Sequence, residues 1–285
     1  MKKNLFVLLF LLTGIPFLGA PQSKPIRLIV RGDDMGFSHS GNEALIRCYK
    51  EGIERSIEVL VPSPWFPEAV KLLEKNPGID VGVHLALTSE WESIKWRPLT
   101  NCPTLTDSDG YFYSMIWPNK NYGKNHALIA NNWNPAEVEK EFRAQIEMAI
   151  KKIPWISHIS AHMGCNSISK EINTLVKKLA TEYKIDIEPA DYGVIGTGYR
   201  GPTATPEQKI NSFIKMLDSL KPGGTYVFVD HPGLDGPELR SIYHIGYENV
   251  AEDRQGVTDL YTSAKIKEAI KKRGIQLISY ADLKK

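Results

Sequence analysis

Short apolar runs alternate with helix-like segments along this chain, and this alternation constrains the fold more than any other feature. Several runs are nearly continuous in apolar residues, which is typical of strands covered on both faces. Strands that alternate with helices are expected to pair in parallel through right-handed crossovers. The predicted strands are residues 26–30, 56–61, 80–84, 156–160, 185–188, 226–229 and 276–279.

The segments between these runs include two clear helices. One begins at Asn134, a suitable N-cap, and continues with Pro135 at the first helical position. The other is predicted from about Ser263 to Arg273. No linker or low-complexity segment separates the strand–helix units. The sequence therefore predicts an α/β fold, a single-domain distorted (β/α) barrel of about seven parallel strands.

The first 20 residues have the pattern of a secretory signal peptide. Lys2 and Lys3 precede an apolar stretch, and small residues end the segment at Ala20. The apolar stretch is short for a membrane span, so we expect no stable membrane insertion after cleavage, with a retained anchor as the alternative. The expectation is a signal peptide at 1–20, a barrel domain at 21–285, and an exported protein that is periplasmic or secreted.

The composition sets further limits on partners. The formal charge is +2, and lysine and arginine are spread along the chain, so nucleic acid is not an expected partner. An odd number of cysteines in an exported protein leaves at least one thiol unpaired or bonded to another chain. The sequence allows one disulfide among Cys48, Cys102 and Cys165 without indicating the pair, and it also allows a homodimer.

One long stretch, from Thr88 to Asn132, lacks helical or strand periodicity. A loop of this length in a compact domain is usually functional, and it follows a predicted strand. It is rich in aromatic residues: Trp91, Trp96, Tyr111, Phe112, Tyr113, Trp117 and Tyr122.

Chemically capable residues gather where four predicted strands end. They are Asp33 and Asp34, His84, His158 and His162, and Asp230 and His231. Each has an ordinary interpretation alone, as a helix cap, a turn, or a polar residue at a solvent boundary. Because the carboxyl ends of parallel strands meet at one edge, their joint occurrence there indicates a functional site.

A divalent metal site fits these residue types. One aspartate oxygen and two histidine nitrogens suit zinc and several other divalent ions, and three protein ligands leave room for water. Neighbouring side chains on a regular strand point to opposite faces, so Asp33 and Asp34 need a turn, such as one at Gly36, to reach one site. One carboxylate would then bind the metal, and the other would take a proton from water.

Four motifs in order resemble those of the YdjC/ChbG-like carbohydrate deacetylases. They are "RGDDMGFSHSGNEAL", "VGVHLALT", "SHISAHMG" and "VDHPG", and the closing "GIQLISYADL" is also similar. The resemblance runs from about Ile26 to Leu283. It implies a distorted (β/α) barrel that removes acetyl groups from N-acetylated sugars with a divalent metal such as Mg²⁺ or Zn²⁺.

Carried over by position, the resemblance makes Asp34, His84 and His162 the metal ligands. It makes Asp33 the general base and His231 the general acid. The chain departs from the family pattern at Ser160, where the family has an acid, at Gly164, where it has a histidine, and at Met35, where it usually has phenylalanine.

The substrate is expected to be a small N-acetylated carbohydrate. Flat rings pack against the C–H faces of sugars, so Trp91 and Trp96 are candidate contacts, with simple covering of the barrel mouth as the alternative. Arg97 is expected either to touch substrate or to brace Asp33. Two competing functions remain: an exported carbohydrate-binding protein without catalysis, and another metal-dependent hydrolase such as a phosphoesterase.

Overall fold

The computed structural model describes residues 24–285, so the predicted signal peptide at 1–20 lies outside the described residues. Seven strands form one sheet in the order β4-β3-β2-β1-β6-β5, and β7 pairs with the first residues of β1. Every pairing is parallel. The strands are β1 (Arg27–Met35), β2 (Ser56–Val59), β3 (Asp80–Leu85), β4 (His158–Ala161), β5 (Val194–Thr197), β6 (Thr225–Asp230) and β7 (Gln276–Ile278).

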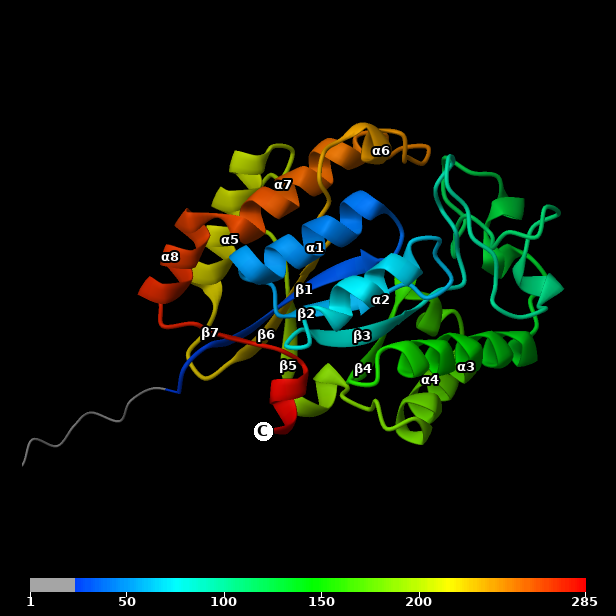
Figure 1. Cartoon of the computed structure of the whole chain (residues 1–285), viewed down its shortest axis with the longest axis horizontal. Coiled ribbons are helices and arrows are strands. Elements are labelled where there is room, and N and C mark those ends of the chain that lie inside the picture. Colours follow the sequence, from blue (N-terminus) through cyan, green and yellow to red (C-terminus); the bar gives the residue numbers. More distant parts are fainter. Residues whose placement is uncertain (1–23) are drawn as a thin grey trace, which may run out of the picture.

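The helices surround this curled sheet (Figure 1), with α3 and α4 near β4, and α5, α7 and α8 near β6. The sheet and its helices confirm the predicted α/β fold, a distorted barrel that stays open between β4 and β5. No helix within residues 24–285 is long and apolar enough to cross a membrane. The helices are α1 (His39–Glu51), α2 (Phe66–Glu74), α3 (Pro135–Lys152), α4 (Lys170–Glu182), α5 (Pro206–Ser219), α6 (Pro237–Arg240), α7 (Val250–Thr262) and α8 (Ala264–Lys272).

The two faces of the sheet differ in polarity. On β2, Ile57 and Val59 join the apolar core beneath the helices, and Val81 and Val83 do the same on β3. The alternate residues turn to the inside of the barrel and include polar side chains, such as His158 and Glu58, whose Nε2 and Oε1 atoms are hydrogen-bonded across the sheet. Strands β2 and β3 therefore alternate rather than run continuously apolar, because only the outer face is covered by helices.

Six of the seven predicted strands overlap observed strands, but the strand predicted at 185–188 is wrong. Its isoleucines are buried without belonging to the sheet, and Ile187 packs with Ile29 and Tyr280. The fifth strand comes later, at Val194–Thr197, after a 3-10 turn and a left-handed residue, Gly193. Apolar residues packed from a loop gave the same pattern as a short buried strand.

Both helices predicted from their ends are present. Oδ1 of Asn134 accepts a hydrogen bond from the backbone N–H of Ala136 at the start of α3, and Ser263 caps α8. The stretch from Thr88 to Asn132 is a loop with three short 3-10 turns: Pro103–Leu105, Lys124–His126 and Leu128–Ala130. Cys48, Cys102 and Cys165 are buried free thiols in the described structure, so the disulfide left open above does not form between them.

Candidate functional site

A bulge at the end of β1 brings two adjacent acids to one place. Gly32 pairs with Ile57, and Met35 pairs with Val59, so β1 carries one more residue than β2 over this interval. Asp34 lies in the left-handed region at φ 70°. The extra residue lets Asp33 and Asp34 share a site. The turn expected at Gly36 is present, at φ 111°, but the bulge begins before it.

Asp34, His84 and His162 form a compact buried group. Oδ1 of Asp34 lies 3.6 Å from Nε2 of His84 and 3.2 Å from Nδ1 of His162. One ligand atom from each residue falls within 4.8 Å of the others, and the three side chains are at most 5% exposed. Among the residues that the structure describes, none makes a hydrogen bond to this Oδ1. A buried carboxylate oxygen without a donor, facing two imidazole nitrogens, fits a divalent cation.

The second oxygen of Asp34 is occupied by an arginine. The guanidinium of Arg254, on α7, donates to Oδ2 of Asp34 over 2.9 Å and packs against the rings of Phe37 and Trp91. Burial alone would raise the pKa of Asp34, but the charges of His231, His162 and Arg254 hold it well below its usual range. Asp34 is therefore an ionised carboxylate with one oxygen left for a ligand.

Asp33 lies beside that group and is held by Arg31. The Arg31 guanidinium donates twice to the Asp33 carboxylate, and both distances are 2.7 Å. Oδ2 of Asp33 lies 3.7 Å from Nε2 of His84. A bidentate arginine fixes the orientation of a carboxylate. Arg97 does not brace Asp33, because it donates to the carbonyl of Asp109 and lies over Tyr111.

His231 faces the group from the end of β6 and is more accessible. Its side chain is 40% exposed, and Nε2 lies 3.8 Å from Oδ2 of Asp34. On its other side, Asp230 lies 3.6 Å from Nδ1 and accepts a hydrogen bond from Tyr199 over 2.6 Å. Burial lowers the pKa of His231, but Asp34 and Asp230 raise it above its ordinary value. The charges around the ring therefore favour its protonated form, and part of the ring is exposed to solvent.

The long loop contributes a carboxylate that the sequence did not single out. Glu90 is buried, and its Oε2 lies 3.0 Å from Nε2 of His162. Burial lowers the pKa of His162, but Glu90 and Asp34 raise it to about 10. With Nε2 directed to Glu90, the Nδ1 atom is the one that faces Asp34, and a metal ion bound there would replace its proton.

The aromatic candidates of the loop are placed differently from the strand-end residues. Trp91 and Trp96 are only 2% and 3% exposed, and the indole N–H of Trp96 donates to the carbonyl of Thr88. Neither ring offers an open face for a sugar, which favours the alternative that they cover the barrel mouth. Trp91 does so directly above Arg254.

The structure thus brings Asp33, Asp34, His84, His162 and His231 together at the carboxyl ends of the strands. It adds Arg31, Glu90 and Arg254, which sequence reasoning missed. Arg31 had a local signal, since it precedes Asp33 by two positions and so shares its face of β1. Arg254 and Glu90 had none, because a helix and a loop carry them to the site from a distance.

Fold and site together define a class: a parallel α/β barrel protein with a buried aspartate–histidine–histidine group at its strand ends. The sequence profile of the YdjC-like protein family matches residues 27–272. The chain belongs to this family.

Two curated relatives agree with that membership, and a solved structure shares the fold. A carbohydrate deacetylase of Listeria monocytogenes serotype 4b (strain CLIP80459) is 30% identical over 266 residues, covering 90% of this chain and all of the relative. A carbohydrate deacetylase of Brevibacillus brevis is 27% identical over 271 residues, with the same coverage. A crystal structure from Enterococcus faecalis V583 superposes with a TM-score of 0.69 at 24% identity, covering 92% of this chain and 99% of that one, which shows the shared fold.

Proposed function

We propose that this chain is a divalent-metal-dependent carbohydrate deacetylase that removes acetyl groups from N-acetylated sugars. The observation that carries the proposal is the buried group of Asp34, His84 and His162, with an unsatisfied Asp34 oxygen and a second, arginine-held carboxylate beside it. The relatives named carbohydrate deacetylases, which match this chain over their whole length, support the same activity.

Asp34, His84 and His162 would hold the metal ion. Two imidazole nitrogens and one carboxylate oxygen favour zinc or a similar transition ion over magnesium, which prefers a shell of oxygens. When bound, such an ion activates water as a nucleophile and polarises the acetyl carbonyl. Arg254 keeps the other oxygen of Asp34 occupied, so the carboxylate can present a single ligand atom.

Asp33 is the proposed general base. It lies next to the ligand group and is held by Arg31, whose two hydrogen bonds fix the direction of its carboxylate. A proton from the attacking water would pass to this carboxylate. A positioned base of this kind contributes about 10²–10⁴-fold in rate.

His231 is the proposed general acid. Its pKa is raised above the ordinary value, and its side chain is 40% exposed beside Asp34. The imidazolium would donate its proton to the departing sugar nitrogen. Asp230 orients the ring through its position beside Nδ1, and Tyr199 in turn orients Asp230.

The test is acetate release from a series of N-acetylglucosamine oligomers. The protein is measured with chelator and after addition of Zn²⁺, Co²⁺, Mn²⁺ or Mg²⁺. We expect metal-dependent release that Asp33→Asn abolishes while the variant still binds metal. Folded protein that binds metal but releases no acetate would contradict the proposal. Binding of sugar without turnover would then support a carbohydrate-binding protein, and release of phosphate from phosphate esters would support a phosphoesterase.

Export is part of the proposal and has its own test. It is supported by the basic start, apolar stretch and small residues of 1–20. Expression of the full chain in a bacterial host should give a periplasmic or secreted product whose N-terminus is Pro21. A cytoplasmic product that begins at Met1 would contradict export without affecting the proposed activity.

A further inference from the structure

We infer that Glu58 is a positioning residue for His84, that it acts through Ser160, and that it determines which His84 nitrogen is free to bind metal. The inference rests on the proposed function, because it assumes that His84 is a metal ligand. It concerns a residue on β2 that lies outside the motifs discussed above.

A chain of short contacts joins the three residues. Oγ of Ser160 lies 2.6 Å from Nδ1 of His84, and the same Oγ hydrogen-bonds to Oε2 of Glu58. Glu58 is fully buried and His84 is 2% exposed. The other nitrogen of His84, Nε2, faces Asp33 and Asp34 at 3.7 and 3.6 Å.

The direction of these hydrogen bonds follows from what each group can donate. An ionised carboxylate only accepts, so the Ser160 hydroxyl donates to Glu58. The Ser160 oxygen is then an acceptor, and it receives the N–H at Nδ1 of His84. Nε2 is left without a proton, with its lone pair directed at the proposed metal position. Second partners of this kind fix the tautomer and orientation of metal-binding histidines.

The ionised form of Glu58 is supported by its neighbours. Its Oε1 lies 2.6 Å from Nε2 of His158, and Arg31 lies 3.9 Å away. Burial would raise the pKa of Glu58, but His158 and Arg31 lower it to about 2. The carboxylate is therefore a fixed acceptor for Ser160 over the whole physiological range.

The register of the sheet allows Glu58 on β2 to contact β4 across β3. Glu58 pairs with Gly82 on β3, and Gly82 pairs with His158 on β4, so the three residues form one row. A Cβ on Gly82 would overlap both the Glu58 carboxylate and the His158 ring. Glycine at this position leaves the passage through which a β2 carboxylate contacts β4.

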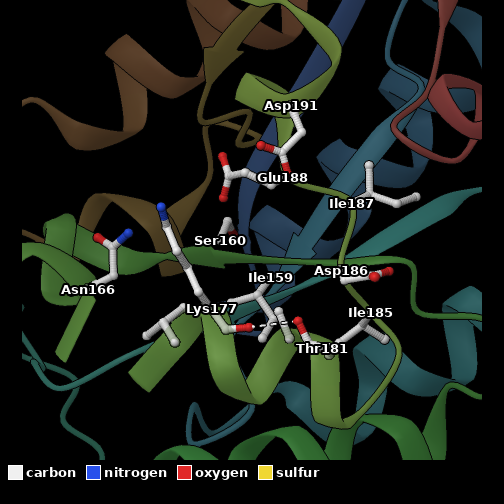
Figure 2. A pocket seen from close by; sticks show the side chains of 12 residues that line it. Ile159, Ser160, Asn166, Lys177, Thr181, Ile185, Asp186, Ile187, Glu188 and Asp191 are labelled. Carbon is white, nitrogen blue, oxygen red and sulfur yellow. Dashed lines mark hydrogen bonds between the residues drawn. The ribbon is translucent and has the colours of Figure 1, made fainter. Parts of the chain in front are cut away.

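This arrangement accounts for the departure at Ser160. Where the family pattern has an acid, this chain has the Ser160 hydroxyl, and that hydroxyl is hydrogen-bonded to the carboxylate of Glu58. Ser160 also borders a cavity of about 220 Å³ at the free edge of β4. Figure 2 shows Ser160 at that cavity, near Glu188 and Asp191. A slightly larger side chain therefore has room at position 160.

The experiment measures Zn²⁺ affinity by competition with a chelator and the His84 tautomer by ¹⁵N NMR of the metal-free protein. Ser160→Ala and Glu58→Gln should each weaken Zn²⁺ binding about 10–100-fold. In wild type the proton should be on Nδ1 of His84, and in Ser160→Ala that preference should be lost. Glu58→Gln/Ser160→Asp restores a carboxylate beside Nδ1 and should recover most of the affinity and the tautomer.

Glu54→Gln is the matched control, since Glu54 is also a fully buried glutamate, but its carboxylate has no hydrogen-bond partner among residues 24–285. It should leave Zn²⁺ affinity and tautomer unchanged. The inference is overturned if wild-type His84 carries its proton on Nε2, or if both single variants bind Zn²⁺ as tightly as wild type. Because neither readout uses turnover, a lack of acetate release in wild type would refute the proposed function and leave this result standing.

Discussion

The two histidines beside Asp34 are supported by different parts of the molecule. His84 belongs to β3 and is held through Ser160 by Glu58, so its support lies entirely within the sheet. His162 follows β4 in a short 3-10 segment and is held by Glu90, which comes from the long loop. His84, Ser160 and Glu58 therefore form a sheet half of the site, which is fixed by strand register. His162 and Glu90 form a loop half, which depends on how the long loop folds over the barrel.

The two histidines are therefore held in place by different kinds of contact, strand pairing for His84 and loop hydrogen bonds for His162. Contacts within a parallel sheet are set by pairing, and a shift by one residue would turn every side chain to the other face. The loop half depends on hydrogen bonds that tie the loop to the segment after β6, such as those from the backbone N–H of Glu92 to Tyr243 and from Ser93 to Ser241. The predictions below act on one half at a time.

The largest effect is expected from His84→Ala in the sheet half. It removes a proposed ligand outright, so metal binding and acetate release should be lost together. Metal content measured by elemental analysis after gel filtration, alongside acetate release, checks this. Retention of one metal ion per chain would remove His84 from the ligand set.

His231→Ala should separate chemistry from metal binding. The proposed role of the ring is to contribute a proton rather than a ligand atom, so we expect acetate release to fall about 10²–10⁴-fold while metal content is unchanged. Steady-state rates with saturating metal provide the measurement. Unchanged turnover at full metal loading would show that another group supplies the proton.

Glu90→Gln tests the loop half. The variant keeps the shape of the side chain but loses the charge beside Nε2 of His162, so metal affinity should fall about 10–100-fold. Glu92→Gln is the control, because Glu92 lies on the same loop but is exposed and bonds to Tyr122. Equal affinities for the two variants, measured by chelator competition, would mean that the loop does not support the site.

Gly82→Ala tests the sheet half through stability. The added methyl group overlaps Glu58 and His158, so the free energy of unfolding should fall by about 1–3 kcal/mol. Gly196→Ala on β5 is the control, since no described atom would lie within 4 Å of its Cβ. Denaturant titrations of both variants measure the free energy of unfolding. Equal decreases in the two variants would show that the space around Gly82 is not tightly packed.

The smallest effect, and one that depends on pH, is expected from Glu54→Gln. Within residues 24–285 neither oxygen of Glu54 has a hydrogen-bond partner, and burial raises its pKa well above the ordinary value. The folded state therefore holds this proton more tightly than the unfolded state, whose pKa is about 4.3. Stability from this group is present below that pH and is lost as pH rises through the folded pKa.

Glutamine does not ionise, so Glu54→Gln should be more stable than wild type at high pH. The difference in the free energy of unfolding should shrink toward pH 4. Unfolding curves collected at several pH values give the comparison. A difference that does not change with pH would mean that the pKa of Glu54 is not raised in the folded protein.

The same division explains what the sequence could predict. Apolar periodicity located six of seven strands, and residues at strand ends identified Asp33, Asp34, His84, His162 and His231 as neighbours. Periodicity failed at 185–188, where isoleucines pack from a loop. It could not find Glu58, Glu90 or Arg254, because their contacts depend on register across three strands, loop conformation and helix docking.

The most direct test of the account is anomalous diffraction from crystals of the protein soaked with Zn²⁺. The account predicts one strong peak in contact with Asp34, His84 and His162, with Asp33 beside the ion but still held by Arg31. A peak at other residues, or none in crystals of a protein that binds Zn²⁺ in solution, would contradict it.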